Sequence, residues 1–226
     1  MASPSSLAHT FFNADIIRQT GPMVTSAVGQ TVLLGLLVIV VGVLLGIVLA
    51  SIRYYTSRRL VTLLIVGYVD VLRALPPLVL LIMVYFALPY VDISISSSLA
   101  TFLCLTAILS AFIEECLWSA ITTLPKGQME ASRSTGMTWS AAMIHVVLPQ
   151  ALKMSLPQIT NRCIATIKNT ALGSVIGFNE ILGNAQAASS DYANPTPLTL
   201  CALIYIALIF PLVLASRYLE HRAGSH

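Results

Sequence analysis

The sequence predicts an all-α membrane protein with about five transmembrane helices, an external N-terminus and a cytoplasmic C-terminus. Hydrophobic residues make up 57% of the 226-residue chain and charged residues only 9%, whereas about a quarter of the residues are charged in a soluble domain. Several uncharged stretches reach the roughly 20 residues that a membrane-spanning helix needs. Most lysines and arginines lie beside these stretches, which is the pattern that orients helices in a membrane.

The first 30 residues are expected to lie outside the membrane or at its surface. Residues 1–30 lack the charged start, short apolar block and cleavage site of a signal peptide. Paired apolar residues within them suggest an interfacial helical turn or two. The first crossing is expected at 31–52. Arg53, Arg58 and Arg59 follow it directly, and such a cluster beside an apolar segment predicts the cytoplasmic side.

Two further crossings follow. The second runs over 60–90 and contains Pro76 and Pro77, which would kink it. A turn without basic residues separates it from a third crossing at 99–121. The polar stretch 122–153 carries three basic residues and is therefore expected to return to the cytoplasm.

The last two crossings differ in polarity. The fourth, 156–182, contains several ionisable and amide side chains, so it is expected to face protein or a water-filled cavity. Residues 183–197 lack basic side chains, which predicts an external loop, and 198–216 forms the fifth crossing. Arg217 and Arg222 then place the end of the chain inside. Of the twelve lysines and arginines, eight lie in proposed cytoplasmic regions, one outside and three within crossings.

The polar stretch between the third and fourth crossings is expected to be a docking element built as helix, elbow and helix. Residues 128–135 can form about two helical turns. Gly136 can adopt the left-handed conformation that closes a helix. Thr138 can cap a second helix over 139–148, which should end near Pro149.

The docking element carries one pair of opposite charges. Glu130 and Arg133 are three residues apart and share one face of the first helix. They could form a solvated pair with each other or contact a partner protein.

Two adjacent acids in the third crossing are the clearest anomaly of the sequence, because ionisable side chains inside a membrane are costly and usually functional. Glu114 and Glu115 point about 100° apart on a helix, so at most one faces a pathway directly. Either acid could instead pair with Arg73, Arg162 or Lys168 inside the bundle.

Other ionisable residues have two interpretations each. Asp70 and Arg73 are three apart and could satisfy each other at the membrane edge. Lys168, with neighbouring amide and hydroxyl groups, could hold a carboxylate, or it could pair with Glu180.

Five motifs, in this order and spacing, resemble those of the polar-amino-acid permeases of ATP-binding-cassette importers. They are Tyr68–Leu78 (YVDVLRALPPL), Ala111–Glu115 (AFIEE), Gly127–Ala131 (GQMEA), Leu148–Leu152 (LPQAL) and Lys168–Leu172 (KNTAL) with the Ile-Gly and Glu-Ile pairs that follow. The resemblance covers most of the chain from Gly29 onward.

The resemblance implies a type I importer permease bundle of the MetI-like kind over residues 31–226, in the cytoplasmic (inner) membrane of a bacterium. Such a chain translocates a polar amino acid or a derivative, coupled to ATP hydrolysis on a separate protein. The implied partners are a dimer of ATPase subunits, a second permease subunit that is identical or different, an extracytoplasmic solute-binding protein and the lipid bilayer. No cofactor is expected in this chain, since ATP and magnesium belong to the ATPase.

The same resemblance assigns roles to residues. The stretch 122–153 matches the EAA loop that presses into the ATPase, and its candidate coupling residues are Gln128, Glu130, Ala131, Arg133 and Gly136. The candidate solute contacts are Glu115, Glu180, Asp70, Arg73 and Lys168. Glu115 comes first because it matches the acid of the family's AYxxE segment, and it is expected to meet an ammonium group.

The chain departs from the family pattern at two places. Ala74 and Leu75 stand where Gly and Thr are usual, which removes a small hydroxyl from the expected solute contacts. Trp118 stands where relatives commonly carry arginine, and it is interpreted as an interfacial aromatic anchor or, less simply, as part of the pathway.

Several classes of function are excluded or disfavoured. The chain has no basic stripe for nucleic acid, no set of metal ligands, and no paired nucleophile and base. It has no GxxxxGK[ST] motif, so it is expected to be non-catalytic and unable to hydrolyse ATP by itself. A passive channel or a non-transporting membrane scaffold is the alternative, but neither explains the EAA-like loop.

Overall fold

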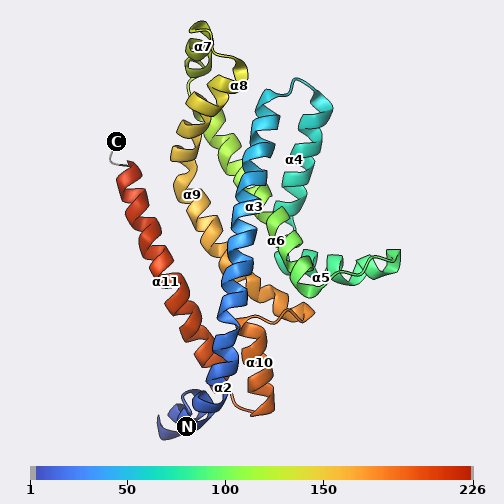
Figure 1. Cartoon of the computed structure of the whole chain (residues 1–226), viewed down its shortest axis with the longest axis vertical. Coiled ribbons are helices and arrows are strands. Elements are labelled where there is room, and N and C mark those ends of the chain that lie inside the picture. The colour runs from blue at the N-terminus through green and yellow to red at the C-terminus, as the bar shows by residue number, and fades with distance from the viewer. Residues whose placement is uncertain (1–3, 225–226) are drawn as a thin grey trace. The chain divides into compact units, whose positions relative to one another are not determined.

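The computed structural model describes residues 4–224, and every regular element within them is helical. Figure 1 shows their order along the chain. The α-helices are α1 (Pro4–Phe11), α2 (Ala14–Ser26), α3 (Val28–Tyr55), α4 (Arg59–Ala74), α5 (Pro77–Ala87), α6 (Ser97–Thr123), α7 (Gly127–Ser134), α8 (Trp139–Ala142), α9 (Leu148–Asn169), α10 (Ile181–Asp191) and α11 (Thr196–Gly224). Three short elements join them: the 3₁₀-helix η1 (Leu88–Val91), the π-helix η2 (Met143–Val147) and the 3₁₀-helix η3 (Thr170–Ile176).

Within the described chain, three helical stretches are long and apolar enough to cross a membrane: His9–Tyr55, Ser97–Thr123 and Thr196–Tyr218. Helices α4 and α5 pass the same test only as a pair, because the chain breaks at Pro76 as expected. The fifth expected crossing, 156–182, falls on α9 and η3 and does not pass, since it carries many polar side chains. Length and composition therefore support up to four crossings, and a fifth through α9 stays a prediction.

The helices form two compact units, which are described separately. The first contains residues 4–38, 77–105 and 164–214, and the second contains residues 39–76, 106–163 and 215–224.

The first unit is built around an apolar cluster from three helices. Val24 and Ala27, at the end of α2, pack with Ile181 and Ala185 of α10 and with Cys201 of α11. The Asn184 side chain also donates a hydrogen bond to the Met23 carbonyl at 3.0 Å. Helix α2 is thus anchored on α10, and the boundary expected at residue 30 lies inside α3.

The second unit is organised by a close approach of α3 to α6. A Cβ atom on Gly46 would lie 2.6 Å from Ile113 Cβ and 2.8 Å from the Ser110 carbonyl oxygen. One on Gly42 would lie 3.0 Å from a methyl carbon of Leu109. Two glycines four residues apart form the small-residue stripe that lets membrane helices approach closely. A side chain larger than glycine at position 46 would force the helices apart, and one at position 42 would require the Leu109 side chain to shift.

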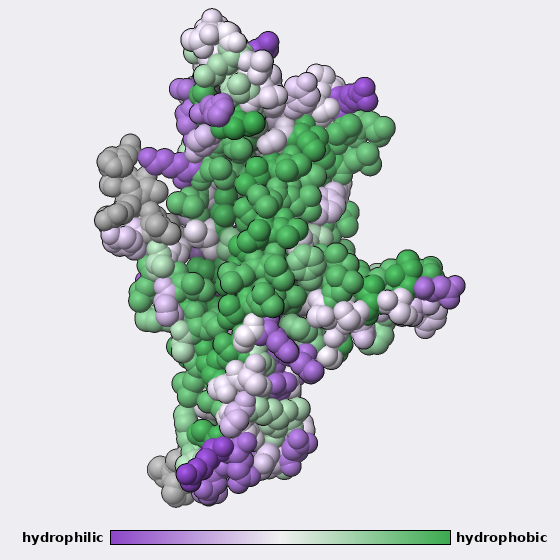
Figure 2. All heavy atoms as spheres, in the orientation of Figure 1, coloured by the Kyte–Doolittle hydropathy of each residue, from purple (hydrophilic) through white to green (hydrophobic). Residues whose placement is uncertain are grey.

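The surface is strongly apolar along the expected crossings (Figure 2). Leu33, Leu36, Val40 and Leu44 of α3 are all exposed. Before Arg53, α3 carries no charged side chain, and such an apolar stretch with an exposed face fits contact with lipid or with another membrane protein. Polar side chains gather instead around α7 and also around α2 and α10 (Figure 2).

Candidate functional site

The elbow of the docking element has the backbone that the sequence predicts. Gly136 follows α7 with φ of 90°, in the left-handed region. The Met137 N–H donates to the Ser132 carbonyl at 3.4 Å, and the Gly136 N–H donates to the Arg133 carbonyl at 3.1 Å. These two bonds make a Schellman motif, which satisfies the last carbonyls of a helix. The predicted stop of the first helix is confirmed.

The second helix begins as predicted but does not end at Pro149. The Thr138 hydroxyl caps α8 by accepting from the Ala141 N–H at 3.2 Å. The chain then passes through the π-helix η2, in which the Leu148 N–H bonds to the Met143 carbonyl, and continues as α9. Proline is tolerated in a first helical turn, and the Gln150 side chain donates to the Val146 carbonyl at 2.8 Å. The expectation that this helix stops near Pro149 is therefore wrong.

The candidate coupling residues are on the surface. Gln128, Glu130, Ala131 and Arg133 are all exposed on α7. Within the described residues, no ion pair joins Glu130 to Arg133. Both charges are therefore free of each other and accessible to another protein.

Four charged residues of the second unit form a compact cluster at α6. Arg53 Nη1 lies 3.1 Å and 3.3 Å from the two oxygens of Glu114, whose side chain is fully buried. Glu115 is 37% exposed, with one oxygen 3.3 Å from Arg73 Nη1 and 3.8 Å from Arg53 Nη1. Adjacent acids thus point in different directions, as predicted. Glu114 is an internal partner of Arg53, and Glu115 is partly exposed beside Arg73.

The sequence reasoning missed Arg53 as a member of this cluster. It was interpreted only as a cytoplasmic topology signal, whereas it lies in the last turn of α3 and its guanidinium sits 4.1 Å from the ring centroid of Trp118. The spacing of Glu114 and Trp118, four residues apart on one face of a helix, is the signal that could have indicated a shared cation. Trp118 is therefore more than an interfacial anchor.

The cluster does not include Asp70. Its side chain is exposed, and among the described residues it forms no ion pair, because Arg73 turns to Glu115 instead. The expected Asp70–Arg73 pair is absent there. The Arg73 guanidinium also lies 5.9 Å from the Phe112 ring centroid, and that of Arg162 lies 3.8 Å from the same ring.

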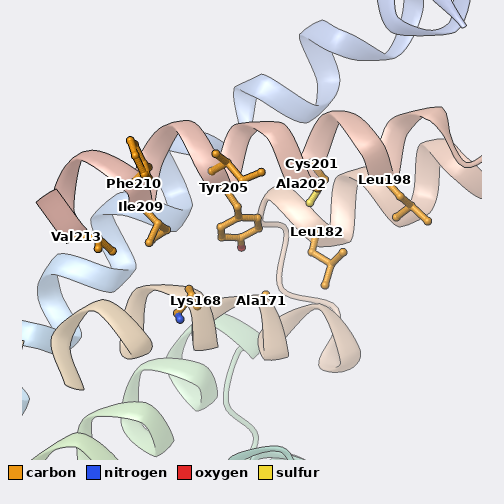
Figure 3. Close-up of a pocket in the computed structure, with 11 residues that line it drawn as sticks. Lys168, Ala171, Leu182, Leu198, Cys201, Ala202, Tyr205, Ile209, Phe210 and Val213 are labelled. Atoms are coloured by element: carbon orange, nitrogen blue, oxygen red, sulfur yellow. The ribbon is translucent and has the colours of Figure 1, made fainter. Parts of the chain in front are cut away.

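The remaining two candidates belong to the first unit. Glu180 is fully buried, and its carboxylate caps α10 by accepting from the Leu182 and Gly183 N–H groups at 2.8 Å and 2.6 Å and from the Tyr205 hydroxyl at 2.8 Å. Lys168 is exposed and lines a mostly apolar pocket of 580 Å³ beside α11 (Figure 3). No ion pair joins Lys168 to Glu180 in the part of the chain that the structure describes. The geometry of Glu180 is that of a structural cap.

Comparison with known families matches residues 42–225 to the "Binding-protein-dependent transport system inner membrane component" family. The chain belongs to this family. Among the relatives of this permease is the "Probable glutamine ABC transporter permease protein GlnP" of Bacillus subtilis, 34% identical over 81% of the permease and 86% of the relative. The "Arginine transport system permease protein ArtQ" of the same organism is 29% identical over 91% and 94%.

Solved structures agree with this assignment. The permease superposes with a TM-score of 0.81 on a chain from "Crystal structure of an amino acid ABC transporter with histidines", at 31% identity over 91% of the permease and 96% of that chain. A chain of the MetNI methionine ABC transporter matches with a TM-score of 0.63 at 22% identity, which supports the fold alone.

The permease is therefore the transmembrane subunit of an ABC importer with a type I, MetI-like fold. Permeases of this family are generally non-catalytic components that work with ATPase and binding-protein subunits. The resemblance seen in the sequence motifs is confirmed, and nothing supports the channel or scaffold alternative.

Proposed function

We propose that the permease carries a polar amino acid or an amino-acid derivative into a bacterial cytoplasm across the inner membrane. The names of relatives, which include glutamine and arginine permeases, support this substrate class. One of two permease subunits, it receives solute from an external binding protein and is driven by a pair of ATPase subunits. The segment 1–30 lies outside or at the outer surface, and the loop 122–153 lies inside.

The Glu115–Arg73 pair is the observation that carries the substrate proposal. The two side chains are 37% and 35% exposed, and their charged atoms are 3.3 Å apart. A free amino acid carries an ammonium and a carboxylate group. It can replace the pair by binding Glu115 at one end and Arg73 at the other, so that each of the two charges keeps a partner of opposite sign.

This exchange is energetically accessible. A pair that water can reach contributes on the order of 1 kcal/mol or less, so opening it costs little. Each new contact then joins a charged group of the solute to a charged group of the permease, and a zwitterionic amino acid leaves the net charge of the pathway unchanged. Lys168 and Asp70 are secondary candidates, and Glu180 is the weakest because its oxygens already accept three hydrogen bonds.

The coupling role rests on α7 and the elbow that follows it. Gln128, Glu130, Ala131 and Arg133 form an exposed polar surface, and the Schellman motif at Gly136 fixes its angle to α8. We assign this surface to the ATPase. ATP-driven closure of the ATPase pair then moves the loop and changes which side of the membrane the bundle opens to.

The test is uptake by the whole reconstituted complex. Proteoliposomes containing permease, ATPase and binding protein are loaded with ATP, and uptake of radiolabelled L-glutamine, L-arginine and L-histidine is measured. We expect ATP-dependent uptake of at least one of them, lowered about tenfold or more by Glu115→Gln and by Arg73→Gln, since tenfold corresponds to about 1.4 kcal/mol.

A matched control is Asp92→Asn, which removes an exposed acid from the turn after η1 and should leave uptake unchanged. Wild-type uptake by a well-assembled Glu115→Gln complex would contradict the assignment of this residue. Solute flux that does not depend on ATP would favour a channel.

A further inference from the structure

A continuous series of side-chain contacts leads from the docking element to Glu115 within the second unit. Trp139, the first residue of α8, has its ring centroid 5.8 Å from that of Tyr54. The Tyr54 ring contacts that of Trp118 edge-on, with centroids 6.5 Å apart. The Arg53 guanidinium lies 4.1 Å from the Trp118 centroid and 3.8 Å from Glu115. Together these contacts connect Trp139, which follows the elbow, to Glu115, the acid proposed to bind the solute.

Arg53 is the member of this series that can change the charge around Glu115. It is held firmly by Glu114 at 3.1 Å and only loosely by Glu115 at 3.8 Å. Its Nε is buried without a hydrogen-bond partner in the described part of the chain. Because Coulomb interactions inside a protein are weakly screened and vary with distance, a small movement of this guanidinium alters how strongly Glu115 is neutralised.

Movement of the docking element reaches Arg53 through its neighbour in the chain. Tyr54 and Arg53 share the last turn of α3, and the Tyr54 ring contacts the rings of both Trp139 and Trp118. Displacement of Trp139 would remove one of the two ring contacts of Tyr54. The last turn of α3 would then shift, and the position of the Arg53 guanidinium relative to the Trp118 ring would change.

We propose that Arg53 is a positioning residue that makes the charge environment of Glu115 depend on the state of the docking element. With Trp139 packed on Tyr54, Arg53 and Arg73 together neutralise Glu115. When the ATPase moves the docking element, Arg53 withdraws toward Glu114, and Glu115 becomes the acid available to a solute ammonium. By linkage, solute bound at Glu115 favours the withdrawn position and so signals back to the ATPase. The solute part of this inference rests on the proposed function, and the change in charge does not.

Tyr55 provides a matched control. Its ring centroid is 4.6 Å from that of Trp139, closer than that of Tyr54. Among the described residues its only aromatic contact is with Trp139, and it forms no ring or cation–π contact with Trp118 or Arg53. The proposal therefore predicts different effects for two adjacent tyrosines that both touch the docking element.

The experiment measures the local charge at position 115 directly. Cys104, Cys116, Cys163 and Cys201 are replaced, Glu115→Cys is introduced, and the complex is assembled with its ATPase. The rates of modification by an anionic and a cationic methanethiosulfonate reagent are compared without nucleotide and with a non-hydrolysable ATP analogue. The ratio of the two rates reports how close the arginines lie, and it needs no knowledge of the solute.

We expect the ratio of the anionic to the cationic modification rate to be about fivefold or more lower with the ATP analogue than without nucleotide, because Arg53 withdraws from position 115. Fivefold is the lower end of usual coupling strengths. Tyr54→Leu should abolish this difference, whereas Tyr55→Leu should preserve it. Arg53→Gln should lower the ratio in the nucleotide-free state and remove the dependence on nucleotide. The double variant Arg53→Gln with Glu114→Gln should do the same without leaving an unpaired buried carboxylate.

An unchanged ratio in the two nucleotide states, or a state dependence that survives Tyr54→Leu, would overturn the proposal. Failure of the solute proposal would look different. The ratio would still respond to nucleotide, but uptake by Glu115→Gln complexes would be normal.

Discussion

Two adjacent residues with the same side chain occupy opposite environments in α6. Glu114 is fully buried and contacts Arg53 through both oxygens, whereas Glu115 is partly exposed between Arg53 and Arg73. A carboxylate that is buried and already paired stabilises the fold when its partner is present. A carboxylate that is partly exposed between two cations, as that of Glu115 is, can exchange one positively charged partner for another.

This difference predicts opposite phenotypes for two chemically identical substitutions. Glu114→Gln leaves the Arg53 guanidinium without its close partner, and breaking a buried pair costs about 3–5 kcal/mol. We expect Glu114→Gln to lower membrane abundance and the thermal unfolding temperature of the purified complex, while Glu115→Gln lowers uptake and keeps both near normal. Size-exclusion chromatography and thermal melts of detergent-purified complexes measure this.

Removing both charges serves as the control. Arg53→Gln with Glu114→Gln should recover most of the stability lost by Glu114→Gln alone, because no unpaired charge is left buried. Equal stability of Glu114→Gln and the native permease would show that the pair contributes nothing.

The sequence could locate the acids but not assign their partners. Glu114 and Glu115 are conspicuous because charges are rare in apolar segments. Arg53 is 61 residues away in sequence, and its position beside an apolar stretch is explained fully by membrane orientation. Nothing in the local pattern shows that its guanidinium turns back toward α6.

At the scale of elements, α3 and α6 approach closely because α3 presents glycine where they meet. Gly42 and Gly46 lie against Leu109, Ser110 and Ile113. The stripe was not recognised in the sequence, because glycines are common in apolar segments and their spacing has meaning only once the facing helix is known.

The close approach predicts a strong effect of a single methyl group. In Gly46→Ala the new Cβ would lie 2.6 Å from the Ile113 side chain and 2.8 Å from a backbone oxygen, so the helices must separate. Overpacking of this kind costs about 1–3 kcal/mol, and the thermal unfolding temperature should fall.

Gly67→Ala in α4 is the control, because a Cβ there meets nothing within 4 Å. Alanine favours a helix over glycine by up to about 1 kcal/mol, so this variant should be as stable as the native permease or slightly more stable. Equal melting temperatures for Gly46→Ala and Gly67→Ala would contradict the tight contact.

The elbow predicts a functional defect without a folding defect. Gly136→Val places a β-branched residue at φ of 90°, a conformation that such residues rarely adopt. We expect ATP-dependent uptake and ATPase co-purification to fall while membrane abundance stays near normal. Gly127→Ala, at the start of α7 with open space around it, should have little effect. Normal uptake by Gly136→Val would show that the elbow does not couple the ATPase.

Local signals explain which element boundaries could be predicted. Gly136 and Thr138 act through hydrogen bonds to residues at most five positions away, and both assignments are correct. Pro149 was interpreted with an equally local rule, but a π-helical turn before it and the Gln150 side chain accommodate it. A π-helical turn has no reliable sequence signal.

At the scale of the whole molecule, the number of crossings depends on α9. Its polar residues lower its hydropathy, so composition alone does not identify it as a crossing. A helix that faces protein or water inside a transporter needs few apolar side chains, because other helices shield it from lipid. Single-sequence hydropathy therefore cannot decide between four and five crossings.

Single-cysteine labelling tests the orientation. On a background without the four native cysteines, a cysteine at position 130 should react with a membrane-impermeant maleimide only from the inner face. One at position 191 should react only from the outer face. Glu130 and Asp191 are both exposed, so access is set by the membrane and not by packing. Labelling of position 130 from outside, or of both positions from one side, would contradict five crossings with the N-terminus out.

The π-helix η2 sets the angular phase between the docking element and α9. A turn closed by a bond to the fifth residue contains one residue more than an α-helical turn. Side chains before and after Met143–Val147 are consequently offset by about 100° from the directions that one uninterrupted α-helix would give them. Deleting a single residue such as Ile144 could leave both helices intact and still point the docking face around the axis to a different side. The direction in which the docking surface faces is thus set by the number of residues in the π-helical turn, independently of the chemistry of the residues that contact the partner.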